Sequence, residues 1–158
     1  MIDLALPQRM RAAVYNGPHD ISLKEVETPR VGAADILIQV TTCGICGSDV
    51  HSYKTGLYVQ RGQIMGHEFM GRVVAVGEDV KGIGLGDRVT GFSAGVCGRC
   101  RACDDGEHIL CADLFENSTG YGRPGAFADY VRIENAAPGV NVHRLPDHLP
   151  DVIAATVE

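Results

Sequence analysis

Long apolar runs are missing from this sequence, and they are interrupted wherever they begin. Gly, Asp or Thr breaks each apolar stretch well before the roughly 20 residues that a membrane helix needs. The N-terminal segment MIDLALPQRMRAAVY contains neither a basic region followed by an apolar run nor a small-residue cleavage site. We therefore expect a cytoplasmic protein that is not exported and does not enter a membrane.

Positive charge is also scarce. The chain has 14 Lys and Arg residues against 20 Asp and Glu residues, which gives a formal net charge of -6. This excess of negative charge repels phosphate backbones, and no cluster of Lys or Arg opposes it locally. Nucleic acid is therefore not an expected partner.

The composition is that of one folded, mainly β domain. Hydrophobic residues make up 45% of the 158 residues and charged residues 22%, which excludes a disordered chain. The 20 glycines and 7 prolines separate short segments rich in Val, Ile and Leu, a pattern typical of a barrel or sandwich. We expect one domain over residues 1–158, with strands near Arg11–Asn16, Ile21–Val26, Asp35–Thr42, Gly71–Val76, Asp87–Phe92 and Ala126–Ile133.

Two helices are expected beside these strands. One follows Cys46, where Ser48 or Asp49 would cap a turn that runs to about Lys54. The other begins near Asp147 and runs to the last residue, with no closing Gly, Pro or basic turn. A helix without an end signal indicates a truncated chain.

Residues 93–123 form the one long segment without strand character, and they contain four cysteines in the pattern CxxCxxCx7C. This spacing lets neighbouring sulfurs point at one centre, and four thiolates at about 2.3 Å fit tetrahedral zinc. A closed four-sulfur site has no open position for substrate, so its role would be to staple a loop with few apolar residues. The expected ligands are Cys97, Cys100, Cys103 and Cys111.

Two disulfides or an iron–sulfur cluster are the alternatives for these cysteines. Structural disulfides are rare where thiols are kept reduced. The ferredoxin type of run ends in Cys-Pro after a shorter gap, whereas Ala112 follows Cys111 here. Zinc is therefore favoured over both.

A second constellation starts at Cys43 with CGICGSDVH and continues with GHE at Gly66. Separately, each piece is ambiguous, because a lone CxxC can be a redox pair and His67 can be a core histidine. Together, Cys46 and His67 supply two of the about three protein ligands that a catalytic zinc takes. The fourth position of such a zinc is kept for water or substrate.

Polar residues flank these two candidate ligands. Asp49 and Glu68 are suited to orient ligating groups, and surface solvation is the alternative for both. Ser48 and His51 are three residues apart on the expected helical turn, so a relay from hydroxyl to imidazole is geometrically possible. Helix capping by Ser48 is the other interpretation, and spacing alone slightly favours it.

The order and spacing of these motifs resemble the zinc-dependent medium-chain alcohol and polyol dehydrogenases. CGICGSDVH, GHE, GDRV, the four-cysteine loop and GAFADYV follow one another at the family's intervals over nearly the whole chain. The resemblance implies a GroES-like β-barrel catalytic domain, followed in the full enzyme by a Rossmann nucleotide-binding domain. That second domain is absent from residues 1–158. Gly82–Asp87 is glycine-rich but has Asp87 where the GxGxxG fingerprint needs glycine, so we expect a turn there.

The resemblance also implies roles for the candidate residues. Cys46 and His67 would bind a catalytic zinc, with Glu68 beside it. Ser48 and His51 would pass the alcohol proton outward. The four cysteines of the loop would hold a structural zinc, in agreement with their spacing.

Other residues complete the implied site. Asp49 would hold the ligand shell, and Cys43 would be a buried, inert thiol. The terminal residues AATVE resemble the AALxE stretch of polyol and threonine dehydrogenases, so Glu158 would be the missing zinc ligand. Gly47 stands where ethanol-type enzymes often place a basic residue, which favours sugar, polyol or amino-alcohol substrates.

The implied activity is oxidation of a secondary alcohol, polyol, sugar or amino alcohol to the carbonyl compound, with zinc and with NAD or NADP. The substrate would be a small molecule, and the full-length enzyme would be a homo-oligomer. Residues 1–158 alone are expected to be inactive, because they contain no nucleotide-binding fingerprint. A stand-alone zinc-stabilised β-barrel that binds a partner without chemistry is the alternative, and a redox-sensing thiol protein ranks below it.

Overall fold

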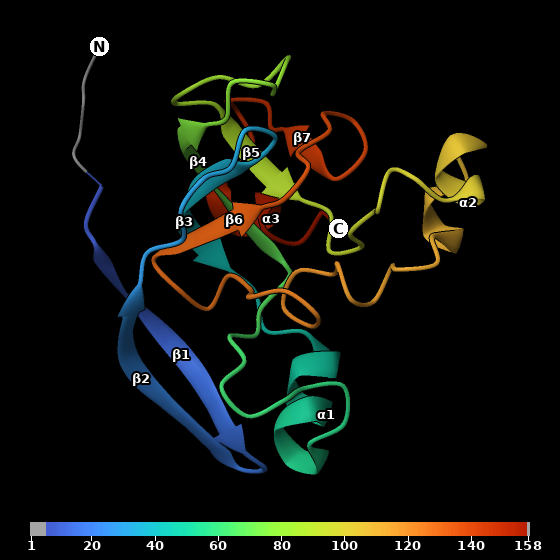
Figure 1. Cartoon of the computed structure of the whole chain (residues 1–158). Coiled ribbons are helices and arrows are strands. Elements are labelled where there is room, and N and C mark those ends of the chain that lie inside the picture. The colour runs from blue at the N-terminus through green and yellow to red at the C-terminus, as the bar shows by residue number, and fades with distance from the viewer. Residues whose placement is uncertain (1–5, 158) are drawn as a thin grey trace.

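The computed structural model describes residues 6–157, and its elements are mostly short strands (Figure 1). The expectation of a mainly β fold with a few short helices is confirmed. Glu158, the expected zinc ligand at the end of the chain, lies outside the described residues. No helix within residues 6–157 is long and apolar enough to cross a membrane.

A β-hairpin forms the first part of the fold. β1 (Arg9–Gly17) pairs antiparallel with β2 (Asp20–Glu27). Alternate residues of a strand point to the same side, and in β1 they are apolar on the inner side. This side packs in a small cluster formed by Met10, Ala12, Val14 and Ile64.

The larger sheet has five antiparallel strands and encloses the main core. In spatial order these are β6 (Tyr130–Ile133), β3 (Ile36–Cys43), β4 (Phe69–Val76), β5 (Arg88–Gly91) and β7 (Val142–Arg144). Short β-branched and aromatic segments favour strands because such side chains fill the space between pleated surfaces. The most deeply buried members of the core are Ile36, Ile38, Phe69, Val73, Val89, Val131 and Val142.

The register of β3 against β4 brings the two expected ligand turns together. Cys43, at the end of β3, pairs with Phe69, at the start of β4. Just beyond this pair, the N–H of Gly44 donates a hydrogen bond to the carbonyl of Glu68 at 2.7 Å. The segment that enters β4 therefore runs beside the segment that leaves β3, and both reach the same end of the sheet.

Helix α1 (Gly47–Thr55) starts directly after this turn. The prediction that Ser48 or Asp49 caps it was wrong by two to three residues, because Cys46 occupies the cap and Asp49 is the third helical residue. The Asp49 carboxylate still stabilises the start of the helix by accepting the N–H of Cys46 at 2.9 Å. The helix ends at Gly56, whose φ of 77° lies in the left-handed region that glycine adopts freely.

The four-cysteine loop extends between β5 and β6, away from both sheets (Figure 1). It contains the short helices α2 (Arg101–Asp104) and η1 (His108–Leu110). Within the described residues, neither helix contains a buried residue. This part of the loop therefore has no apolar core of its own to hold it.

Two predicted boundaries near the end of the chain were wrong. The helix expected from Asp147 is α3 (Asp151–Ala154), because Pro150 disfavours helical backbone in the residue before it. The strand expected from Ala126 begins only at Tyr130, where it is β6, and Phe127 and Asp129 before it also form hydrogen bonds with β1. The short strand β7 was not predicted, because three residues are too few to show a period.

Candidate metal centres and active site

The cysteines of the loop converge as their spacing predicts. The Sγ atoms of Cys97, Cys100, Cys103 and Cys111 all lie within 4.8 Å of one another. Cys97 Sγ lies 4.0 Å from Cys103 Sγ, and Cys100 Sγ lies 3.6 Å from it. Four thiolates at about 2.3 Å from a tetrahedral zinc would be about 3.8 Å apart, so these sulfur–sulfur separations fit such an ion. Disulfide bonding would need sulfurs at about 2.05 Å, and all four cysteines are free.

Backbone amides prepare this cluster for negative charge. The N–H of Cys97 donates to Cys111 Sγ at 3.3 Å. Hydrogen bonds from backbone groups lower the pKa of Cys100 to about 6, and the one from Ala112 contributes most. Burial raises the pKa of Cys103 to about 11, so the cluster does not ionise completely by itself near neutral pH. A divalent cation that accepts all four sulfurs would displace the remaining protons.

The second donor set lies at the end of the sheet where β3 and β4 meet. Ligand atoms of Cys46, His67 and Glu68 lie within 4.8 Å of one another. His67 is buried, whereas Cys46 and Glu68 are partly exposed, so the set is open on one side. A Cβ atom at Gly44 would lie 2.7 Å from Glu68 Oε2, so a larger residue there would require the carboxylate to move.

Asp49 orients the histidine of this set from inside α1. Its Oδ1 lies 3.7 Å from Nδ1 of His67, and both side chains are less than a tenth exposed. His67 Nδ1 is buried and has no closer hydrogen-bond partner within the described chain. A proton on Nδ1 would face the carboxylate and would leave Nε2 as the lone-pair donor for a metal. Burial raises the pKa of Asp49, while the N–H of Cys46 and the nearby His67 oppose this effect.

Ser48 lies beside the metal-facing nitrogen rather than at the helix cap. Its Oγ is 3.4 Å from His67 Nε2 and accepts a hydrogen bond from Tyr121 Oη at 2.7 Å. In the part of the chain that the structure describes, Ser48 forms no hydrogen bond with His51. The His51 side chain is exposed, and its ring centroid lies 6.4 Å from that of Tyr58.

A family model described as the alcohol dehydrogenase GroES-like domain matches residues 32–147. The chain belongs to this family. It is 40% identical over 152 residues to an L-threonine 3-dehydrogenase from Deinococcus deserti, and the alignment covers 94% of this chain and 40% of the relative.

Solved structures resemble this GroES-like domain over a similar extent. An alcohol dehydrogenase from a Thermus species has a TM-score of 0.80 and 36% identity, with 90% of this chain and 42% of that chain covered. A zinc-binding dehydrogenase from Sinorhizobium meliloti, whose structure contains NADP, has a TM-score of 0.80 and 34% identity, with coverage of 94% and 42%. The GroES-like domain therefore spans less than half of each relative.

Both donor sets of the GroES-like domain fit zinc by the chemistry of their atoms. Four thiols suit a closed structural centre, and a thiol, an imidazole and a carboxylate with one open side suit a centre that accepts a further ligand. The sequence indicated the cysteines, His67 and Glu68 of these sets as candidate ligands. It did not indicate Tyr121, whose one signal was its position just before the GAFADYV motif.

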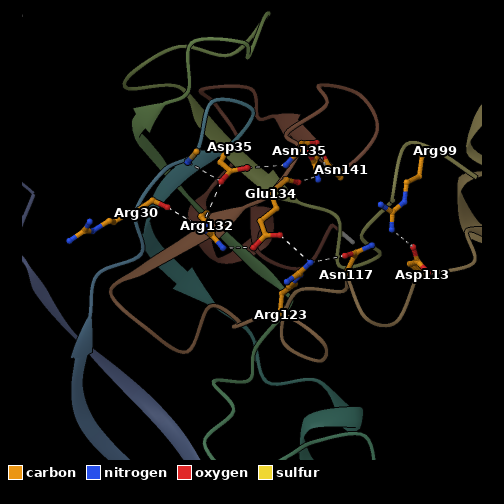
Figure 2. A network of polar contacts seen from close by, with 11 residues as sticks. Arg30, Asp35, Arg99, Asp113, Asn117, Arg123, Arg132, Glu134, Asn135 and Asn141 are labelled. Carbon is orange, nitrogen blue, oxygen red and sulfur yellow. Dashed lines mark hydrogen bonds and ion pairs between the residues drawn. The ribbon is translucent and has the colours of Figure 1, made fainter.

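A polar network in the GroES-like domain includes Asn117 and Arg123 (Figure 2), which lie on either side of Tyr121 in the sequence. Arg123 donates to Asn117 Oδ1 at 3.0 Å and pairs with Glu134 at 3.2 Å. Glu134 also pairs with Arg132, which lies 3.8 Å from Asp35, the residue directly before β3. The end of the cysteine loop is therefore joined to β6 and β3 by charged side chains as well as by the backbone.

Proposed function

We propose that this chain is the zinc-carrying catalytic domain of an NAD- or NADP-dependent dehydrogenase that oxidises a secondary alcohol, polyol, sugar or amino alcohol. The observation that carries this proposal is the convergence of Cys46, His67 and Glu68 on a centre with one open side. A relative is named L-threonine 3-dehydrogenase, and a solved neighbour contains NADP. The proposed reaction is removal of a hydride and a proton from a carbon that bears a hydroxyl group.

The roles of the residues follow from their places. Bound zinc would supply a Lewis acid that lowers the pKa of a substrate hydroxyl. Ser48, with its Oγ beside His67 Nε2, would accept the hydroxyl proton while passing its own proton outward, and the exposed His51 would release a proton to water. Asp49 would hold the ring of His67 in one orientation.

Glu158 is proposed as the further ligand of this centre. The support comes from α3, because Ala154 and Ala155 are buried against Met70, which is the second residue of β4. Since β4 directly follows Glu68, this packing brings the end of the described chain to the strand that carries the ligand turn. A Glu158→Gln variant is expected to bind zinc at this centre more weakly than the parent.

The first test is the zinc content of the purified protein by elemental analysis, before and after mild chelation. We expect two zinc ions per chain, with the ion at Cys46 removed first because its site is open and has fewer thiolates. Cys46→Ser should abolish the labile ion alone, and Cys100→Ser should abolish the tightly held ion. A protein without zinc would contradict the proposal, and one ion lost only with Cys100→Ser would support a zinc-stabilised binding domain instead.

The second test is activity. Residues 1–158 assayed alone with NAD or NADP are expected to show no alcohol oxidation above a protein-free blank, because the chain has no nucleotide-binding fingerprint. The same residues joined to the remaining part of the Deinococcus deserti relative should reduce the cofactor with threonine or a polyol. Cofactor reduction that survives Cys46→Ser would contradict the assigned centre.

A further inference from the structure

Tyr121 reaches the candidate active site from the far end of the cysteine loop. Its hydroxyl donates to Ser48 Oγ at 2.7 Å, and its ring centroid lies 5.1 Å from that of His67 with an interplanar angle of 33°. The ring is also 5.6 Å from that of Phe115. One side chain therefore touches both the proposed proton acceptor and a proposed metal ligand.

The backbone holds Tyr121 at the tip of a tight turn. The N–H groups of Tyr121 and Arg123 both donate to the carbonyl of Ser118, at 3.2 Å and 2.9 Å. Gly120 has a φ of 85°, and a Cβ at this position would lie 2.9 Å from the carbonyl oxygen of Gly66. The turn is thus pressed against the residue that precedes His67, so the direction of the tyrosine is set by the fold.

The hydrogen bond limits what Ser48 can do with its own proton. A serine hydroxyl has one O–H donor and two acceptor lone pairs. Because Tyr121 donates to Ser48 Oγ, one lone pair is occupied and the serine proton must point elsewhere. Among the described residues, a second polar atom near Ser48 Oγ is His67 Nε2 at 3.4 Å, on the side of the open donor set.

Helix capping does not compete for this hydroxyl. Cys46 occupies the cap of α1, and no side-chain capping bond is made there by Ser48. Ser48 is only partly buried, so without Tyr121 its hydroxyl could rotate toward water. The tyrosine is the group that removes this freedom.

We propose that Tyr121 is a positioning residue for Ser48, which fixes the rotation of the serine hydroxyl so that its remaining lone pair can accept the substrate proton. The part that this hydroxyl plays in proton transfer rests on the proposed function. Tyr121 keeps its own proton and acts only through Ser48. The ring packs against His67 independently of the hydroxyl, and Tyr121→Phe separates these two contributions.

The first measurement is a double-mutant cycle on urea unfolding of the chain at saturating zinc, with Tyr121→Phe, Ser48→Ala and the double variant. A single hydrogen bond is expected to change the unfolding constant about fivefold, and this loss should occur only once in the double variant. Tyr53→Phe is the matched control, because Tyr53 Oη donates one hydrogen bond to the carbonyl of His19 at 3.0 Å, away from Ser48. Its effect should add fully to that of Ser48→Ala. Additive effects of Tyr121→Phe and Ser48→Ala would overturn the proposal.

The second measurement replaces zinc by cobalt(II) and records its visible absorption. The spectrum of each variant is compared with that of the same variant carrying Cys46→Ser, so that the difference reports the centre at Cys46. Tyr121→Phe should change the visible bands of cobalt, and this change should disappear in the Ser48→Ala background. Tyr53→Phe should leave the bands unchanged. An unchanged spectrum of Tyr121→Phe, or an equal change without Ser48, would overturn the positioning role. If Cys46→Ser itself has no effect on the spectrum, the proposed function fails and the unfolding cycle alone decides whether Tyr121 controls Ser48.

Discussion

Replacing Arg88 by methionine is expected to destabilise the folded chain by about 2–3 kcal/mol. The guanidinium donates to the carbonyls of Pro146 and Leu149 at 2.5 Å and 2.6 Å, and to Asp151 Oδ1 at 2.7 Å. It thereby fastens the turn before α3 and the first residue of α3 to β5. Methionine keeps the length of the stem but removes every donor.

The magnitude follows from how differently the partners are exposed. The Arg88 side chain is 8% exposed and that of Asp151 is 43% exposed. Hydrogen bonds to a charged group contribute about 1.5–3 kcal/mol each, so three of them set an upper limit well above the expected loss. Once Arg88 is gone, water can reach Asp151 and the exposed carbonyl of Pro146, which recovers much of this energy.

Thermal unfolding followed by circular dichroism tests this value at saturating zinc, so that metal loss does not add to the change. For a domain of this size, about 2–3 kcal/mol corresponds to a lower melting temperature by about 5–10 °C. Arg144→Met is the matched control, because Arg144 pairs with Asp87 at 2.6 Å with side chains 59% and 27% exposed. Such a pair contributes at most about 1 kcal/mol. If Arg88→Met loses no more stability than Arg144→Met, the reasoning about the buried guanidinium is refuted.

Three further outcomes are expected. Gly44→Ala should weaken zinc binding at the labile site about tenfold, because the added Cβ displaces Glu68. Gly47→Ala should leave zinc binding unchanged, because a Cβ there meets nothing within 4 Å. Competition with a chromophoric chelator measures the zinc affinity of both variants. Asp129→Asn should lower stability at neutral pH, because the hydrogen bond from Arg11 lowers the pKa of Asp129 in the folded chain. Stability from a lowered carboxyl pKa is present above the unfolded value of about 3.9 and is lost as pH falls through the lower folded value, so the parent and the variant should converge in urea unfolding at acid pH. A strong chelator that empties the cysteine loop should make residues 93–117 susceptible to protease before the sheet unfolds; cleavage in the strands first would contradict a stapling role for zinc.

Local chemistry made much of this molecule predictable. The four loop cysteines are close in sequence, so their convergence needs little help from the rest of the fold. The strands around Ile38 and Val73 are long enough to show their apolar pattern. Cys46 and His67 were paired from ligand chemistry, and the register of Cys43 with Phe69 supplies the physical reason that they meet.

Contacts that depend on tertiary structure were less accessible. Tyr121 meets Ser48 across a long stretch of chain, and its direction depends on a turn fixed by Gly120 and Arg123. The position of α3 was misjudged because helical spacing was visible near Asp147, while the effect of Pro150 on the preceding residue was overlooked. Neither feature has a period or a spacing that could be read locally.

Tyr121 lies ten residues after Cys111, so a short stretch of chain connects the four-cysteine centre to the centre at Cys46 and His67. Loosening of the distal centre would be transmitted through that length to the hydroxyl of Ser48, while the ligands of the proximal centre remain anchored to β4 and α1. The zinc centre of the loop would therefore also align the Ser48 hydroxyl, and its loss would misdirect that hydroxyl before the protein unfolds.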